Sequence, residues 1–206
     1  LPFVQGQLTN NLEALDDGMA QRTGLCSPKG RLLADFVAIR VGAEFFLVLS
    51  SAITELIHKR LAMFVLRAKV NIENVTQAAP PIGVLSQLDS SPNDWPDPML
   101  VRQDEQSRLL IGLESITVAG KPQARVISLT PNQTLADDLQ TYQAQGYSLA
   151  PTAWWHTTEA LAGTPRIGTA SSDAFVPQMI NFELVGGVSF QKGCFPGQEV
   201  VARMQY

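Results

Sequence analysis

The sequence contains very few of the residues on which metal, disulfide and nucleophilic Cys–His sites depend. Among 206 residues there are only two cysteines, Cys26 and Cys194, and two histidines, His58 and His156. Two cysteines far apart in the chain form no disulfide framework, and this inventory excludes the usual zinc patterns. Neither histidine lies in a recognisable protease or transferase motif, so a cysteine hydrolase is not expected. The simplest interpretation is a reducing, cytoplasmic setting.

Other absences narrow the possible surroundings and partners of the protein. No apolar run approaches the roughly 18 residues that cross a bilayer, and the first residues lack the basic segment followed by an apolar one that marks a signal peptide. The net charge is −4 and the pI about 5.1, so the totals provide no positive surface for general nucleic-acid binding. Basic residues between 59 and 69 form either a local patch or a solvated helix face. We expect no membrane span and no direct general nucleic-acid binding.

The hydrophobic fraction of 45% and the charged fraction of 17% favour a buried core over disorder. Near the start, four apolar residues are spaced to share one face of a short helix: Val4, Leu8, Leu12 and Leu15. The elements predicted next are strands at 19–26, 31–41 and 44–49, a helix over 53–64 that Ser50 and Ser51 can cap, and a strand at 70–75. Turns at 27–30 and 42–43 join the three strands.

The second part of the chain follows a proline-containing joint at 77–81 and roughly repeats this order. Its predicted elements are strands at 82–88, 109–113, 116–118 and 124–129, and helices that begin near Asn132 and Pro151. Residues 89–98 are polar and hold three prolines, so we expect a loop in which Trp95 is a local anchor. We therefore predict an α+β protein with lobes at residues 1–78 and 79–206, and we allow for interleaving of the lobes.

The stretch from Lys192 to Glu199 reads Lys-Gly-Cys-Phe-Pro-Gly-Gln-Glu and is the most distinctive in the chain. Its two glycines permit a tight turn. If the following residues are helical, Gly197, Gln198 and Glu199 form the first turn, where a negative charge is favoured. Lys192 and this helix terminus would then favour a reactive thiolate at Cys194. The alternative is that Cys194 is a small buried hydrophobic residue.

Five segments, taken in order, carry a resemblance to a known family. They are residues 5–10, the Lys-Gly-Arg hairpin at 27–36, residues 162–165, residues 175–181, and the stretch at 192–199 with the preceding Gly186-Gly187-Val188-Ser189-Phe190. These segments resemble those of the YgfZ-type folate-binding proteins. That family is related to the aminomethyltransferase (T-protein) of the glycine cleavage system and includes mitochondrial iron–sulfur assembly factors. The matches spread over nearly the whole chain, so the resemblance is specific.

The resemblance implies two related lobes of mostly antiparallel sheet with helices, around a central cavity that binds tetrahydrofolate or another folate. In the family a small β-barrel follows the signature, and this sequence stops just after it. We interpret the chain as a fragment, a trimmed form or a divergent short form. A folate site needs an aromatic or apolar wall with amide and carboxylate groups, and the candidates are Gln178, Asn181, Phe195, Gln198 and Glu199. Alternatively, Gln178 and Asn181 satisfy backbone groups of their own loop.

Asp35 is a further candidate because it lies within a predicted strand, where a carboxylate needs a partner or a ligand. An ion pair with Arg31 or Lys29 is the alternative. The aminomethyltransferases have two adjacent acids at this place, whereas this chain has Ala34 beside Asp35. They also carry a folate-contacting glutamate where this chain has Leu161. Both departures count against transfer chemistry.

The leading hypothesis is a folate-binding accessory protein that supports the assembly or repair of iron–sulfur enzymes and tRNA modification. Cys194, Lys192 and Asp35 are its candidate reactive residues, and iron–sulfur proteins are its expected clients. A stable cluster normally takes four thiolates, so any cluster must be shared with another protein. The alternatives are a folate-dependent one-carbon (aminomethyl) transferase and a structural adaptor in which Cys194 is unreactive.

Overall fold

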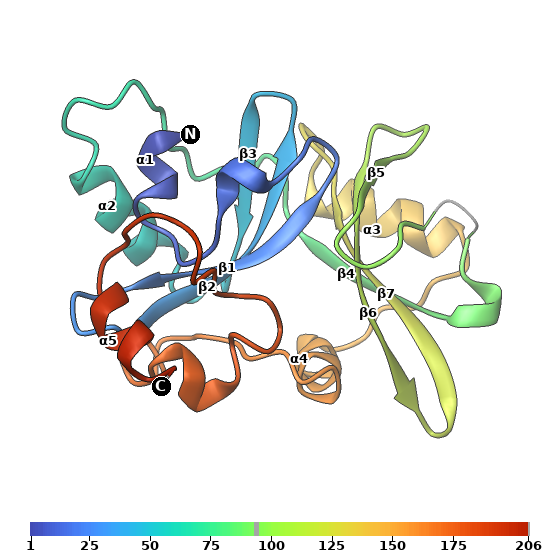
Figure 1. The fold of residues 1–206 in the computed structure, drawn as a ribbon. Coiled ribbons are helices and arrows are strands. Elements are labelled where there is room, and N and C mark those ends of the chain that lie inside the picture. Colours follow the sequence, from blue (N-terminus) through green and yellow to red (C-terminus); the bar gives the residue numbers. More distant parts are fainter. Residues whose placement is uncertain (93–94, 206) are drawn as a thin grey trace. The chain divides into compact units, whose positions relative to one another are not determined.

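The computed structural model describes residues 1–92 and 95–205 and confirms the predicted α+β class (Figure 1). The chain forms two compact units, each with its own antiparallel sheet. The first unit comprises Leu1–Asn74 together with Thr164–Tyr206, and the second comprises Val75–Gly163. The C-terminal segment therefore belongs to the same unit as the start of the chain, whereas the predicted division at residue 78 grouped it with residues 79–163.

The sheet of the first unit is built from two hairpins in the order β1-β2-β3. Its strands are β1 (Ala20–Cys26), β2 (Leu32–Val41) and β3 (Glu44–Val48). Both predicted turns are confirmed. Gly30 and Gly42 adopt left-handed backbone angles, with φ of 73° and 58°, that residues other than glycine rarely adopt.

The helix predicted over residues 4–15 is wrong, although its apolar face is buried. The structure has a short helix α1 (Pro2–Gln5) and a separate 3₁₀ turn η1 (Leu12–Ala14). Between them Leu8 forms an isolated β-bridge with Leu25. The Gln5 side chain closes the loop, because its amide nitrogen donates to Asn11 and its oxygen accepts from Leu12 N–H, both at 2.8 Å. The apolar residues have helical spacing because they are buried on one side of the chain, although the backbone between them is not a helix.

Helix α2 (Thr54–Met63) confirms the predicted helix, but the predicted cap is wrong, because the N-cap is Ile53 and no side chain caps the helix. The carbonyl of Ser50 accepts from Ile53 N–H and from the Thr54 hydroxyl. The strand predicted at 70–75 is wrong, since these residues pair with no strand. Instead, a ring nitrogen of His58 on α2 lies 3.0 Å from the Ile72 carbonyl oxygen.

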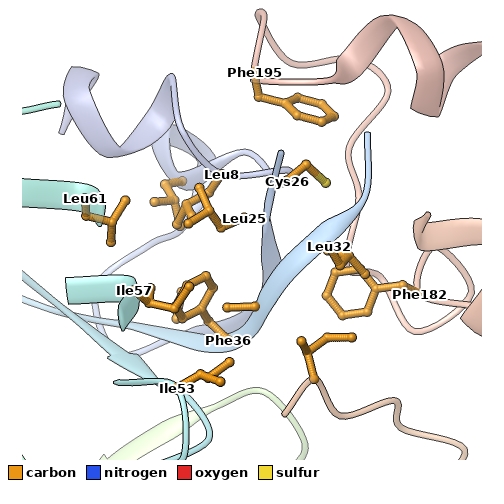
Figure 2. Packing of buried hydrophobic residues seen from close by; sticks show 14 of the residues in the cluster. Leu8, Leu25, Cys26, Leu32, Phe36, Ile53, Ile57, Leu61, Phe182 and Phe195 are labelled. Carbon is orange, nitrogen blue, oxygen red and sulfur yellow. The ribbon is translucent and has the colours of Figure 1, made fainter. Parts of the chain in front are cut away.

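The C-terminal segment completes the first unit. It holds a 3₁₀ turn η3 (Pro177–Ile180) and helix α5 (Gln198–Arg203), so the residues after the signature, for which the sequence left helix and strand open, are helical. Strand β3 pairs only with the second half of β2. In the first half of β2, the Leu32 N–H instead donates to the Phe175 carbonyl, and the Leu32 carbonyl accepts from the Asp173 N–H, both at 2.8 Å. The core beneath includes Leu8, Leu25, Cys26, Leu32, Phe36, Ile57, Phe182 and Phe195 (Figure 2).

The second unit holds a four-stranded antiparallel sheet in the order β4-β7-β6-β5. Its strands are β4 (Ile82–Gln87), β5 (Val101–Gln103), β6 (Leu109–Val118) and β7 (Lys121–Leu129). The strands predicted at 109–113 and 116–118 are one strand with a register shift between them. The short β5 was not predicted. The predicted loop at 89–98 begins within a 3₁₀ turn η2 (Leu88–Ser90), and its residues 93–94 lie outside the described part of the chain.

Two helices of the second unit confirm the sequence prediction, with one change of cap. They are α3 (Leu135–Ala144) and α4 (Thr152–Leu161). The cap of α3 is Thr134, whose hydroxyl accepts from Asp137 N–H, whereas the expected cap Asn132 sits in a left-handed turn. Trp95 is the expected anchor, because its ring packs against the small core of this unit.

Candidate functional site

The signature loop contacts the Lys-Gly-Arg hairpin backbone to backbone. Gly197 has a φ of 77° and is the N-cap of α5. A Cβ atom at this position would lie 2.4 Å from the Ser27 carbonyl oxygen and 2.5 Å from the Gly30 nitrogen. A Cβ at Gly30 would in turn lie 2.8 Å from the Val200 Cβ atom. The two segments fit together only because both glycines lack a side chain.

Lys192 ties the signature loop to the start of the chain. Its side chain is 8% exposed, and its ammonium donates to the carbonyl oxygens of Gln5 and Leu8. The ammonium also lies 5.4 Å from the centroid of the Phe195 ring. Burial lowers the pKa of Lys192 from 10.5 to about 8, while the charge of Glu13 opposes this shift.

The opening segment is held between β1 and the glycine pair that precedes the signature. The buried Thr9 hydroxyl donates to the Gly187 carbonyl at 2.6 Å and accepts from Gly24 N–H at 2.7 Å. The Asn10 amide donates to the carbonyls of Gly186 and Arg22 at 2.7 and 2.8 Å. These bonds explain why a threonine and an asparagine stand in this segment, because both side chains hold backbone groups of neighbouring segments.

The segment at 175–181 also meets the signature, through α5. The Gln178 side-chain amide donates to the Val201 carbonyl at 2.8 Å. Its oxygen is buried and has no hydrogen-bond partner among the residues that the structure describes. We call residues 5–10, 27–30, 175–181 and 186–199 the motif cluster. All four segments lie in the first unit and are joined by the contacts above.

The two cysteines of the first unit have opposite environments, and only Cys194 belongs to the motif cluster. Cys26 is 1% exposed, and burial raises its pKa to about 12, so it is an inert hydrophobic residue of the core. Cys194 is exposed at the surface. Its neighbour Phe195 is 6% exposed and belongs to the same buried cluster as Cys26 (Figure 2). The structure therefore fixes both sides of Cys194, through Lys192 and Phe195, and leaves the thiol accessible.

Asp35 has a backbone partner in the C-terminal segment. One carboxylate oxygen accepts from Ile167 N–H at 2.6 Å, and the side chain is half-buried in β2. Arg31, a proposed ion-pair partner, donates to the carbonyls of Asp173 and Ala174 at 3.3 and 3.2 Å. Through this hydrogen bond, the carboxylate holds the C-terminal segment at Ile167 against strand β2. A reactive role for Asp35 stays a prediction.

The remaining candidates lie on and beside α5. Gln198 is its first residue and is half-buried. Glu199 is exposed and accepts a hydrogen bond from Arg203 at 2.9 Å, an ion pair on the helix surface that contributes little stability. Asn181 is exposed and ends η3 with a φ of 55°, a backbone angle for which asparagine is favoured. Ligand contacts by these residues, and the central cavity itself, stay predictions.

No family model matches the chain, but curated bacterial proteins match it along 99% of its length. The tRNA-modifying protein YgfZ of Edwardsiella ictaluri is 28% identical over 204 residues, and that of Colwellia psychrerythraea is 29% identical over 209. The protein of the same name from Serratia proteamaculans is 29% identical over 212 residues. The chain is therefore similar to the tRNA-modifying protein YgfZ along nearly its whole length. It spans about 61% of the length of these relatives.

The motif cluster contains positioning contacts that sequence reasoning did not predict. Thr9, Ser27 and Gly197 position the loops, yet single-sequence patterns offer no periodic signal for such contacts. The detectable signal was indirect, because glycines that flank a cysteine and open a helix indicate close backbone approach.

Two further findings concern metal-ligating groups and the lengths of the helices. Within residues 1–92 and 95–205, no group of three or more histidine, cysteine or acidic side chains could hold a metal ion. None of the helices in the same ranges has the length and apolar character needed to cross a membrane.

Proposed function

We propose that this chain binds a folate and supports iron–sulfur enzymes, among them enzymes that modify tRNA, with Cys194 as its functional thiol. Its relatives named tRNA-modifying proteins support the tRNA part of this proposal. The observation that carries the role of Cys194 is its presentation. A buried lysine and a buried phenylalanine flank an exposed thiol, on a loop whose backbone packs against the hairpin at 27–30.

A firmly held loop suits a thiol that must meet a second molecule in one orientation. Ordering a flexible loop at the moment of contact costs conformational entropy, whereas this loop is already ordered by its contacts with Gln5, Leu8 and Ser27. Cys194 cannot supply four thiolates, so we expect it to act in transient contact with a client protein.

We place the folate beside α5, where Gln178 offers a buried amide oxygen without a partner in the described structure. A pterin ring carries N–H groups that would donate hydrogen bonds to such an oxygen. Gln198 and Glu199 supply further polar groups at the same helix. Phe195 is buried in the core, so its task in the proposal is to anchor the loop rather than to cover the ligand.

The one-carbon transferase is the weaker alternative. Ala34 stands where the aminomethyltransferases have a second acid, and it is 0% exposed within the core of the first unit. An acid there would be buried among apolar side chains, at a large desolvation cost. The neighbouring Asp35 already accepts a hydrogen bond from Ile167. Turnover of an aminomethyl donor with tetrahydrofolate would restore this alternative.

The folate proposal predicts saturable binding of tetrahydrofolate in titration calorimetry, together with protection of the Cys194 thiol. Because Cys26 is buried, alkylation by iodoacetamide under native conditions reports on Cys194. We expect bound folate to slow this alkylation by about tenfold, since the ligand would cover the exposed thiol. A Cys194→Ala variant gives the background rate. Absence of saturable binding would contradict the folate proposal.

The thiol proposal predicts a loss of function for Cys194→Ala in cells. In a bacterium that lacks its own YgfZ, we expect this chain to restore thiolated tRNA nucleosides, measured by mass spectrometry, and the variant to restore less than about a tenth as much. Gln191→Ala is the matched control, because Gln191 is also exposed, directly precedes the signature and has no part in the proposed folate or thiol site. Equal restoration by Cys194→Ala and the unchanged chain would refute the role of the thiol.

A further inference from the structure

The second unit has a cavity of about 460 Å³ that involves none of the motif cluster. Its lining residues come from the end of β4 and the loop after it, from the start of β6 and from the end of α3 and the residues that follow. The lining is a mixture of aromatic, amide and hydroxyl side chains around one arginine: Trp95, Tyr142, Tyr147, Gln106, Gln145, Ser86, Ser90 and Arg108, with Pro92, Leu110 and Gly146. Its volume falls in the range of about 300–1,000 Å³ typical of small-molecule sites.

Arg108 is fixed in place before any ligand arrives. Its Nε donates to Asp104 at 2.6 Å, and the two side chains are only 7% and 3% exposed. Asp104 also accepts from the backbone N–H groups of Gln106 and Arg108, each at 2.9 Å. This closed turn between β5 and β6 orients the guanidinium toward the lining of the cavity, so a ligand would meet a preorganised donor.

The guanidinium of Arg108 retains N–H groups that can donate further hydrogen bonds. Its Nη1 is buried and has no hydrogen-bond partner among the residues that the structure describes. Its Nη2 makes only a long bond of 3.3 Å, to the exposed residue Gln106. Because Asp104 already balances the charge, the free N–H groups favour a neutral acceptor such as a carbonyl oxygen over a free anion.

The aromatic rings of the cavity suit a flat partner. The rings of Trp95 and Tyr147 are 6.5 Å apart between centroids and nearly parallel, at 11°. Tyr142 stands edge-on to Tyr147 at 5.5 Å, and the Arg108 guanidinium lies over the Tyr142 ring at 4.8 Å. A third flat ring can therefore stack in the orientation shared by Trp95 and Tyr147 while its edge reaches polar groups.

We infer that this cavity binds a nucleobase that carries carbonyl groups, as in guanosine or uridine. Aromatic stacking supplies affinity for any base, and hydrogen bonds to the base edge supply selectivity. Arg108 would donate to the base carbonyl, and the amides of Gln106 and Gln145 can pair with neighbouring N–H and C=O groups. The site belongs to the second unit alone and does not depend on the proposed role of Cys194.

Calorimetric titration with three probes tests this inference. Guanosine has a base carbonyl, purine riboside has the same ring system without one, and methyl glucoside has no aromatic ring. We expect guanosine to bind saturably, purine riboside to bind about tenfold more weakly, and methyl glucoside not to bind. Equal binding of guanosine and purine riboside, binding of the glucoside alone, or no binding of any probe would overturn the inference.

Two tryptophan variants locate the binding. Trp95→Leu is expected to weaken guanosine binding by at least about tenfold, because a stacking surface is lost. Trp154→Leu is the matched control, since Trp154 is 56% exposed on α4 of the same unit and does not line the cavity. The hydrogen-exchange protection of β6 and β7 verifies that both variants keep the fold. Unchanged guanosine affinity in a folded Trp95→Leu variant would place the ligand elsewhere and refute the site.

Discussion

Replacing Gly197 with alanine is expected to destabilise the first unit by about 3 kcal/mol or more. The added Cβ would lie 2.4 Å from the Ser27 carbonyl oxygen and 2.5 Å from the Gly30 nitrogen. These are backbone atoms and cannot rotate away as the end of a side chain could. The φ of 77° adds a cost of about 1 kcal/mol or more for any residue with a side chain. The signature loop must therefore separate from the hairpin at 27–30.

Gly193→Ala is a matched control in the same loop, because no atom lies within 4 Å of its added Cβ. Native-state hydrogen exchange of peptides from β1 and β2 measures the effect on the first unit. The tryptophan fluorescence is an internal reference, since Trp95, Trp154 and Trp155 all belong to the second unit. Similar exchange rates in Gly197→Ala and Gly193→Ala would show that the hairpin contact is unimportant for stability.

Lys192 is expected to make the stability of the first unit increase with pH above about 8. Its pKa falls from 10.5 in the unfolded chain to about 8 in the folded protein, chiefly because of burial. Between these values the unfolded chain holds a proton that the folded protein has released, so the free energy of unfolding increases with pH. The full shift corresponds to about 3 kcal/mol, at about 1.4 kcal/mol per pKa unit. Below about pH 8 Lys192 is protonated in both the folded and the unfolded chain, so this gain in the free energy of unfolding is absent.

The measurement is urea unfolding followed by circular dichroism, on the unchanged protein and on Lys192→Met, between pH 7 and 10.5. The difference in unfolding free energy between the two proteins should grow with pH in favour of Lys192, because methionine does not titrate. Lys59→Met is the control, since the Lys59 side chain is 72% exposed. A difference that stays constant across this range would mean that Lys192 keeps its ordinary pKa in the folded state.

The sequence predicted the hairpins of the first unit because each has a local cause. Gly30 and Gly42 favour the turns, and the apolar character of β2 follows from burial in the sheet. The errors arose where tertiary contacts decide the backbone. Leu8 and Leu12 are fully buried at helical spacing, but Leu8 forms a β-bridge with Leu25 and the chain around it is not helical. Local spacing reports which side of a chain is buried, and the backbone conformation depends on what lies there.

The candidate site shows the same division between local and distant causes. Residue types within the signature predicted a tight turn, and the structure shows the left-handed Gly197 there. The partners of Lys192 could not be predicted, since Gln5 and Leu8 contribute backbone carbonyls that any residue would provide. The burial of Phe195 was equally hidden, because an aromatic residue in a polar loop suits a ligand wall as well as a core anchor.

The return of residues 164–206 to the first unit has a consequence for synthesis on the ribosome. The second unit is continuous in sequence, from Val75 to Gly163, so all its residues emerge together. The first unit begins earlier but lacks Ile167, Phe182, Phe195 and Val201 of its core until the last part of the chain is made. The nascent chain therefore carries an uncovered apolar sheet while the later unit folds, and the part that is synthesised first is completed last.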